Sequence, residues 1–302
     1  MKIIYPDYYP AFRCIAADCR RNCCVGWEID IDPDTLRRYD AMPGPLGERL
    51  ARCIDRKGDT ASFRLTERER CPFLNDENLC DIILEAGHGA LCQICADHPR
   101  FRNAFSGRVE MGLGLCCEAA CALVLNAKEP VRLIAAGEDA SETEQETAFF
   151  AWRDRLLAAA QNRALPVAER MHLILNACGL PLPDFSLREW ALVYLGLERM
   201  DEAWTAVLTR ALSPLEAAPL DEIAKEQLLV YFLYRYLSAG FLQGDLAGYA
   251  AFAVLSAQMI CRLCAAPEEL AETARLYSAE IEYSDENVQT LIDVIYESEE
   301  EP

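Results

Sequence analysis

The segment Cys14–Cys24 reads C-I-A-A-D-C-R-R-N-C-C, and the interpretation of the whole chain depends on it. Cysteines at this density and at short spacings indicate a metal or cluster site, a disulfide framework or chance enrichment. Twelve of the 15 cysteines lie before residue 122. They are Cys14, Cys19, Cys23 and Cys24, then Cys53, then Cys71 and Cys80, then Cys92 and Cys95, and finally Cys116, Cys117 and Cys121.

The rest of the sequence favours a metal over disulfides. The chain begins M-K-I-I-Y-P-D-Y-Y-P, which has neither the apolar core nor the cleavage site of a signal peptide. We find no apolar run that approaches the roughly 18 to 20 residues of a membrane span. We therefore expect a cytoplasmic protein in a reducing compartment, where clustered cysteines bind metal more often than they form disulfides.

The spacings favour an iron–sulfur cluster or a multinuclear site over a single zinc. Thiolates are soft ligands that suit either zinc or iron. Cys92 and Cys95 form one zinc-type knuckle, but the adjacent Cys23 and Cys24 cannot easily chelate one zinc ion together. The ferredoxin run C-x₂-C-x₂-C-x₃-C-P is absent from the sequence. His98 follows Cys95 at a ligand spacing, although a lone histidine is more often structural.

Charge divides the chain into two parts. Residues 1–126 carry 16 Lys and Arg against 19 Asp and Glu, a net charge of −3, whereas residues 127–302 carry 13 against 30, a net charge of −17. An acidic surface repels nucleic acid phosphate, so we expect no nucleic acid partner, and likewise no membrane. The same surface attracts a basic peptide or a lysine side chain, although a solvated acidic face is the more ordinary explanation.

The expected fold class is mainly α, with a cysteine-rich, irregular metal-binding module at 1–126 packed on an acidic all-helical domain at 127–302. Prolines in residues 1–12 predict an extended segment. Alternation predicts a short strand at 27–31, and Asp32 followed by Pro33 predicts a helix to Ala41. Further predictions are a loop at 43–47, a strand at 61–66, a hairpin-like loop at 71–80 and helices at 81–86 and 118–125.

After Asn126 the pattern is helical. Capping boxes at Ser141/Glu144 and Ser186/Glu189 predict two helix starts. Pro166 and Gly179 bound another helix, and Asp221 caps one that ends at Gly240. Further helices are expected at 245–264, 267–281 and 285–297, followed by a disordered acidic tail. Cys178, Cys261 and Cys264 lie in apolar helical context and are expected to be small buried hydrophobes.

Four motifs in order resemble the flagellin lysine-N-methylase family, within the broader YkgJ-type cysteine-cluster proteins. They are Y-x-x-F-x-C-x₄-C-x₃-C-C-x-G-W from Tyr9, C-P-F-L-N-x₄-C-D-I from Cys71, L-C-x-x-C-x-x-H-P-R from Leu91, and Cys117-Glu118 with Ala119. The resemblance covers residues 5–125. It departs at Cys117-Glu118, where the family usually has Cys-Pro-Glu. The matching motif positions are Cys14, Cys19, Cys23, Cys24, Cys71, Cys80, Cys92, Cys95 and Cys117.

The resemblance implies a protein lysine N-methyltransferase that uses S-adenosylmethionine and carries a [4Fe-4S] cluster, with zinc as the alternative metal. Flagellin or another lysine-bearing protein is the implied substrate. Methyl transfer needs a neutral amine, so a carboxylate or tyrosine must hold or deprotonate it. Tyr8, Tyr9, Glu28 and Asp30 flank the cluster loop and are the catalytic candidates. A non-catalytic zinc- or iron-binding scaffold and an electron-transfer module remain alternative functions.

Overall fold

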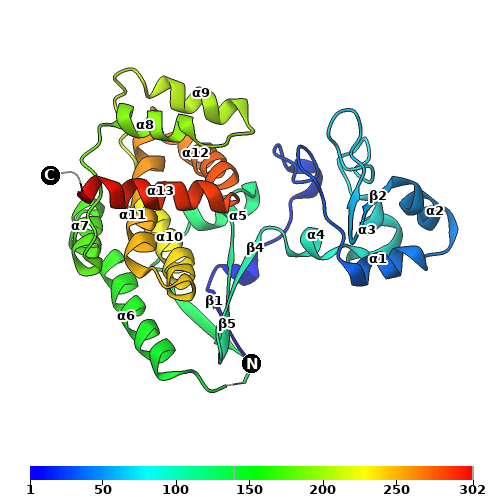
Figure 1. The fold of residues 1–302 in the computed structure, drawn as a ribbon, viewed down its shortest axis with the longest axis horizontal. Helices are drawn as coiled ribbons and strands as arrows, with labels where there is room; N and C mark the ends of the chain where they lie inside the picture. Colours follow the sequence, from blue (N-terminus) through cyan, green and yellow to red (C-terminus); the bar gives the residue numbers. More distant parts are fainter. Residues whose placement is uncertain (139, 301–302) are drawn as a thin grey trace. The chain divides into compact units, whose positions relative to one another are not determined.

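The computed structural model describes residues 1–138 and 140–300, with side chains as far as residue 298. The chain forms two compact units (Figure 1). The cysteine-rich unit is Arg13–Phe101, and the helical unit is Met1–Phe12 together with Arg102–Pro302. This division differs from the expected boundary at residue 126, because the first strand of the chain is built into a sheet of the helical unit.

That sheet has four strands in the order β4-β5-β1-β6. Strand β1 runs parallel to β5, with Lys2 opposite Arg108, and antiparallel to β6, with Ile3 opposite Ala136. The extended segment expected at the start of the chain is thus a strand between two strands that come more than 100 residues later. The strands are β1 (Lys2–Pro6), β4 (Arg100–Ala104), β5 (Arg108–Leu113) and β6 (Leu133–Ala136).

Helices make up the rest of the helical unit, and α10 and α11 pack against each other at its centre (Figure 1). Both are buried along most of their length, which explains their nearly continuous apolar sequence. The helices are α5 (Glu118–Leu125), α6 (Glu144–Ala160), α7 (Val167–Cys178), α8 (Leu187–Gly196), α9 (Glu202–Arg210), α10 (Glu222–Gln243), α11 (Leu246–Leu263), α12 (Leu270–Tyr277) and α13 (Asp285–Glu300). A π-helix, Ser278–Glu282, follows α12.

Most of the predicted helix starts in this unit are confirmed. Ser186 and Glu189 form the capping box of α8, and Gly179 ends α7 in the left-handed conformation at φ 77°. The capping box of α6 lies two residues later than predicted, at Thr143 and Glu146. Helix α9 was not predicted, and α10 continues past Gly240 to Gln243.

The cysteine-rich unit has short elements around a small core. Asp32 caps the first helix as predicted, since its Oδ1 accepts a hydrogen bond from the Thr35 backbone N–H at 2.9 Å. The elements are α1 (Pro33–Asp40), α2 (Gly44–Cys53), β2 (Ile54–Lys57), β3 (Thr60–Phe63), α3 (Asp81–Ala86) and α4 (Gln93–Asp97). The hairpin-like loop between Cys71 and Cys80 is confirmed by an antiparallel bridge that joins Leu74 to Cys80.

Two local predictions in this unit are wrong. The loop expected at 43–47 is the start of α2, because a proline is tolerated in the first turn of a helix and the helix buries Leu46 and Leu50. The strand expected at 27–31 is an isolated bridge between Asp30 and Ser62. The alternation still reports burial correctly, since Ile29 and Ile31 are 3% and 5% exposed.

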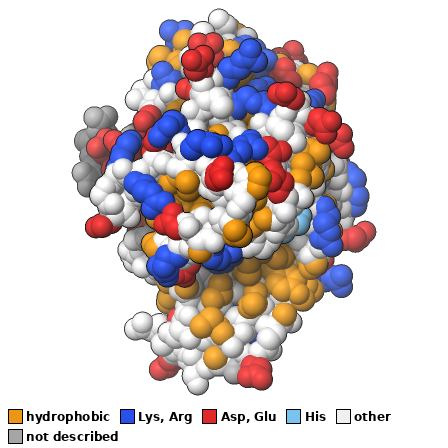
Figure 2. Space-filling model, turned by 90° about the vertical axis from the view of Figure 1, so that its right-hand side faces the viewer, with side chains coloured by type: hydrophobic (Ala, Val, Ile, Leu, Met, Phe, Trp, Pro, Cys, Tyr) orange, Lys and Arg blue, Asp and Glu red, His pale blue; other side chains and the backbone are white. Residues whose placement is uncertain are grey.

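Two expectations about the chain as a whole also need correction. Helix α11 is long and apolar enough to cross a membrane by length and composition, although 67% of it is buried within the protein, as in a core helix. The acidic tail is helical as far as Glu300, and residues 301–302 lie outside the described part of the chain. On the face drawn in Figure 2, basic and acidic side chains are interspersed, with apolar areas between them.

Candidate functional site

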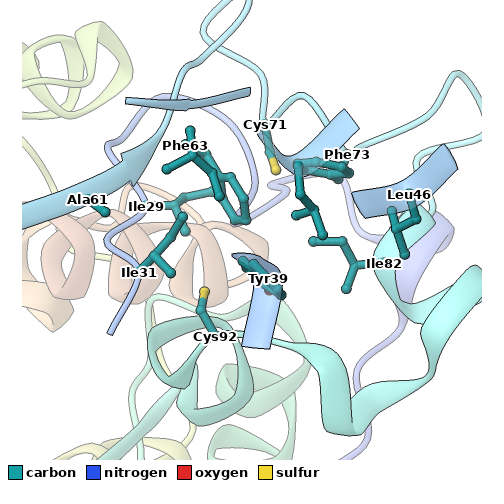
Figure 3. Close-up of a cluster of buried hydrophobic side chains, with 12 residues drawn as sticks. Ile29, Ile31, Tyr39, Leu46, Ala61, Phe63, Cys71, Phe73, Ile82 and Cys92 are labelled. Atoms are coloured by element: carbon teal, nitrogen blue, oxygen red, sulfur yellow. The ribbon is translucent and has the colours of Figure 1, made fainter. Parts of the chain in front are cut away.

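Six thiols gather around the core of the cysteine-rich unit. Cys71 and Cys92 belong to the core itself, and four more cysteines pack against it: Cys24, Cys53, Cys80 and Cys95. Figure 3 shows the sulfurs of Cys71 and Cys92 among the core side chains that surround Phe63, Phe73 and Tyr39. Buried sulfur in an apolar core has few water molecules to solvate a negative charge, so thiolates there need a cation.

Two pairs of cysteines are in direct contact. A hydrogen bond to Cys23 raises the pKa of the Cys24 thiol, and burial and repulsion from Cys23, Cys71 and Cys80 raise it further. The same bond lowers the pKa of Cys23. The contact therefore favours the thiolate form of Cys23 and opposes ionisation of Cys24.

Cys95 and Cys92 repeat this arrangement. A hydrogen bond to Cys92 raises the pKa of Cys95, followed by burial and by repulsion from Cys92, Cys24 and Cys71. The Cys23/Cys24 pair and the Cys92/Cys95 pair thus share one neighbourhood with Cys71. The structure brings together segments that are about 70 residues apart in sequence.

Backbone N–H groups point at several of these sulfurs. Burial raises the pKa of Cys71 to about 11, against hydrogen bonds from the N–H groups of Phe73 and Leu74. Burial likewise raises the pKa of Cys80, against N–H groups at the start of α3. Such hydrogen bonds favour the thiolate and tune the sulfurs of metal and cluster sites.

The donor chemistry fits a soft metal or cluster. Within residues 1–138 and 140–300, however, no three His, Cys, Asp or Glu side chains are arranged to hold one metal ion. The residue types and their shared neighbourhood therefore fit such a group.

Three of the predicted metal ligands lie elsewhere. Cys14 accepts a hydrogen bond from the Ala16 backbone N–H at 3.4 Å, and Cys19 donates one to the Arg21 carbonyl at 3.3 Å, in an exposed loop. Cys117 belongs to the helical unit, where it is the N-cap residue of α5. Eight of the nine predicted ligands thus lie in one unit and Cys117 in the other.

His98 has a structural environment. Its ring meets that of Trp27 edge to face, with 5.8 Å between centroids. Burial, with help from Arg100, lowers the pKa of His98 to about 4, so the imidazole is neutral near pH 7.

The four catalytic candidates are divided between the units. Tyr8 and Tyr9 follow β1 in the helical unit, whereas Glu28 and Asp30 lie in the cysteine-rich unit. Tyr9 contacts the sulfur of Met111 at 3.9 Å through its hydroxyl oxygen. Glu28 accepts a hydrogen bond from Ser62 Oγ at 2.7 Å.

A cavity of about 250 Å³ in the helical unit was not anticipated from the sequence. Tyr8 contributes to its wall, together with residues of α6 and α10. The sequence did contain one indication of it, because the spacing of Tyr231 and Tyr234 places both side chains on one face of a helix. Nothing in the sequence indicates which element lies opposite that face.

Similarity to known proteins supports the class that the cysteine motifs indicate, the flagellin lysine-N-methylase family. A lysine-N-methylase of Salmonella typhimurium is 26% identical over 134 residues, which cover 42% of this chain and 33% of that protein. A lysine-N-methylase of Salmonella choleraesuis matches to the same extent. The flagellar biosynthetic protein FliU of Salmonella muenchen is 25% identical over 134 residues, 79% of its length.

The resemblance to this family is thereby confirmed at distant identity. The chain spans about a third of the length of the two lysine-N-methylases it matches. No family model matches the chain, and no solved structure matches it.

Proposed function

We propose that this protein transfers a methyl group from S-adenosylmethionine to lysine side chains of a protein substrate of the flagellin type. The observation that carries the proposal is the similarity to relatives named lysine-N-methylase. The cofactor proposed beside it is a thiolate-held [4Fe-4S] cluster, with zinc as the alternative. The gathering of Cys24, Cys71, Cys80, Cys92 and Cys95 supports that part of the proposal.

The proposed reaction is a direct displacement. The lone pair of a neutral lysine ε-amine forms a bond to the methyl carbon, the carbon–sulfur bond breaks, and its electron pair stays on sulfur as a thioether. The nitrogen then loses one proton to a base. Among the four candidates, Tyr8 has a pKa raised by burial and by Asp7. It is therefore a neutral phenol that can position an amine, whereas the proton acceptor is proposed to be a carboxylate.

A bound cluster would supply a compact positive centre that holds the cysteine segments together and can exchange electrons. The paired thiols Cys23/Cys24 and Cys92/Cys95, with Cys71 and Cys80, are the residues that would hold it. Since the free energy of metal binding is also free energy of folding in small metal modules, loss of the metal would loosen the cysteine-rich unit.

The acidic excess of residues 127–302 supports a basic or lysine-rich substrate. A net charge of −17 over that part of the chain raises the local concentration of a cationic partner. Salt screens such attraction over a Debye length of about 8 Å at physiological ionic strength. The apparent KM for a lysine-rich protein should therefore rise with salt while kcat changes little.

The test is to purify the protein without oxygen and measure its iron and zinc content and its visible absorbance. It is then incubated with S-adenosylmethionine and flagellin from the same organism, and lysines are searched for methyl increments by mass spectrometry. Methyl increments that require both partners support the proposal. Metal-loaded protein that leaves every lysine unmodified, in reducing and non-reducing buffer, would favour a scaffold or electron-transfer protein instead.

A further inference from the structure

Strand β6 leaves one edge of the four-stranded sheet open. It is the last strand in the order β4-β5-β1-β6, and it pairs antiparallel with β1 along one side. The backbone N–H of Asp7 donates to the carbonyl of Arg132 at 2.9 Å, which makes these two residues a hydrogen-bonded pair. Hydrogen-bonded and non-hydrogen-bonded pairs alternate along an antiparallel ladder. The N–H and C=O groups of Leu133 and Ala135 therefore point away from β1.

These edge groups have no partners in the described part of the chain. Within residues 1–138 and 140–300, no hydrogen bond reaches the N–H or C=O of Leu133 or Ala135. Pro6, which has no N–H to donate, lies opposite Leu133 and agrees with this register. Ile134 and Ala135 are exposed, and no described helix packs closely along this side of the strand.

The edge also lacks the features that usually prevent a sheet edge from pairing. Natural edge strands are protected by charged side chains, prolines or bulges. Strand β6 reads L-I-A-A, and its register with β1 is continuous. The charge that precedes it, Arg132, has an ion-pair partner in Asp7 at 3.3 Å. An open apolar edge of this kind is a template for the addition of another strand.

The cavity of about 250 Å³ opens beside this strand on the inner face of the sheet. Pro6 and Leu133 line it from the sheet, and Leu157 and Ala158 line it from α6. Because side chains alternate between the two faces of a strand, every second side chain of a strand added to β6 would point towards this cavity. It is smaller than the range of about 300–1,000 Å³ that encloses drug-sized ligands, so it suits single aliphatic side chains.

One polar group at the end of the open edge also lacks a partner. Gln161, the C-cap of α6, donates through Nε2 to the carbonyl of Val131 at 3.3 Å, just before β6 begins. Its Oε1 is buried without a hydrogen-bond partner in the described part of the chain. A buried acceptor without a partner costs free energy, which the N–H of an incoming backbone would recover.

The outer face of the sheet offers apolar surface to the same added strand. Ile134 is 36% exposed and lies opposite Tyr5 in the ladder. The ring of Tyr5 packs against that of Tyr9, with 5.4 Å between centroids. Both faces of an added strand would therefore contact apolar side chains, whereas its backbone would meet the unpaired groups of β6.

We propose that the open edge of β6 binds an extended segment of a partner protein by antiparallel strand addition. The segment pairs its backbone with Leu133 and Ala135, and its aliphatic side chains at alternate positions enter the cavity beside Leu157. This partner site goes beyond the proposed methyl transfer and does not depend on it.

The first experiment titrates peptides into the full chain and follows its amide signals by NMR. The probe is acetyl-Lys-Thr-Val-Thr-Val-Thr-Lys-amide, whose valines face the cavity in the proposed register. Directly opposed residues share a face of the sheet, so the valine N–H groups point at β6 and that of the central threonine points away. N-methylation of both valines should therefore weaken binding at least about tenfold, whereas N-methylation of the central threonine should leave the affinity unchanged.

Equal affinities of the two methylated peptides would overturn the proposal. The reverse order of affinities would indicate a parallel strand and would also overturn it. In the complex with the unmodified probe, we expect the amide hydrogens of Leu133 and Ala135 to become protected from exchange with solvent, because they are the ones that gain partners.

A backbone variant of the protein locates the binding. Ala135→Pro removes an outward N–H without removing a bond to β1, and proline is tolerated at such a position of an edge strand. It should weaken binding of the probe at least about tenfold at an unchanged melting temperature, whereas Ala135→Ser, which keeps the N–H, should bind like the parent. Unchanged affinity in Ala135→Pro would place the peptide elsewhere and overturn the proposal. If Ala135→Pro does not fold, the two methylated peptides still decide.

Sedimentation of the parent protein tests a second copy of this chain as the occupant of the edge. A parent dimer that Ala135→Pro converts to a monomer, together with no binding of the probe, would assign the edge to self-association and overturn the proposal. Because no turnover is measured, failure of strand addition leaves the proposed methyl transfer standing. Failure of the methylation assay likewise leaves the partner site standing.

Discussion

The carboxylate of Asp32 accepts a hydrogen bond from the backbone N–H of Gln93 at 2.8 Å, so the cap of α1 also holds the first turn of α4, which follows Cys92 and contains Cys95. Its other oxygen caps α1 through Thr35. Burial alone would raise the pKa of Asp32, but these hydrogen bonds from Gln93 and Thr35 outweigh burial and lower it. One side chain thus joins a helix start to a pair of thiols that is about 60 residues later.

Replacing Asp32 should therefore affect both the start of α1 and the start of α4. Asp32→Asn keeps one acceptor oxygen but lacks the second, and we expect it to lower the free energy of unfolding by about 1–2 kcal/mol. Asp34→Asn is the matched control, because Asp34 is exposed in the first turn of the same helix. Chemical denaturation of the two variants measures the difference. Equal stabilities would mean that the bond to Gln93 contributes nothing.

The buried thiols give a second prediction. Cys71→Ser should reduce the iron or zinc content of anaerobically purified protein, because Cys71 lies at the centre of the thiol neighbourhood. Cys178→Ser is the control, since Cys178 is a half-buried thiol on α7 in the other unit. Metal analysis of both variants and of the parent protein is the measurement. The same metal content in Cys71→Ser as in the parent would remove Cys71 from the ligand set.

A stability measurement in the presence of a chelator separates loss of metal from loss of fold. If Cys71→Ser only disturbs packing, its melting temperature should fall by the same amount with and without chelator. If the thiol holds a metal, the difference between variant and parent should shrink once the metal is removed from both, because metal binding stabilises only the folded state.

Local signals predicted many elements of the fold correctly. Asp32-Pro33 and the capping box at Ser186 need only residues within one turn, and the structure has both helices where they were expected. The capping box of α6 shows where such signals fail. Ser141/Glu144 and Thr143/Glu146 have the same spacing, and the choice depends on a hydrogen bond from the distant Ser106.

The division into units could not be read from composition. Cysteines continue to Cys121, which suggested a module ending near residue 126, yet residues 102–126 and 1–12 belong to the helical unit. The reason is the parallel pairing of β1 with β5, a contact between segments far apart in sequence that leaves no local pattern. For the same reason, the sequence singled out Tyr8 as a catalytic candidate but could not reveal the cavity that it lines.

The cysteine motifs, in contrast, were informative at long range. Thiols from three separate segments share one core, and they stand at motif positions: Cys24, Cys71, Cys80, Cys92 and Cys95. Sequence alone could not separate these from Cys14 and Cys19, which lie in an exposed loop, or from Cys117, which lies in the other unit. Packing against the core of the cysteine-rich unit, which depends on tertiary structure, makes the distinction.

At low pH, protonation of Glu146 should lower the stability of the helical unit. Hydrogen bonds from the backbone N–H groups of Ser106, at 2.7 Å, and of Thr143, at 2.8 Å, lower the pKa of Glu146 from its usual value of 4.5, against burial. A carboxyl whose pKa is lower in the folded state than in the unfolded state stabilises the folded protein at pH values above its unfolded-state pKa. This stabilisation is lost as the pH falls through its folded-state pKa. We therefore expect the loss below about pH 4.5.

Urea unfolding at about pH 6 and about pH 3.5 checks this expectation. Glu146→Gln should have a lower free energy of unfolding than the parent protein at the higher pH. The difference between the two free energies should become smaller at the lower pH. Glu144→Gln, in the same turn of α6, removes a carboxylate that caps no N–H in this way and should show little pH-dependent difference. If the difference in free energy of unfolding stays constant over this pH range, the charge of Glu146 is not the source of the acid sensitivity.

The last prediction concerns Glu110 and Arg153, a buried ion pair that couples β5 to α6. Glu110 is 0% exposed and Arg153 1% exposed, and Ser238 of α10 donates a hydrogen bond to Glu110 at 2.7 Å. Removing one partner leaves the other charge buried, which costs about 3–5 kcal/mol. Glu110→Gln should therefore be severely destabilised in chemical denaturation.

Glu110 also pairs with Arg108 at 3.0 Å, so the double variant Glu110→Leu/Arg153→Met still leaves the Arg108 charge buried. The double variant should recover only the part of the loss that comes from Arg153, because replacing buried charges by apolar residues is neutral only when every partner is replaced. A double-mutant cycle in chemical denaturation gives the coupling energy. Additive single effects in the cycle would mean that the two charges stabilise the fold independently, and the pair would then not be what joins the sheet to the helices.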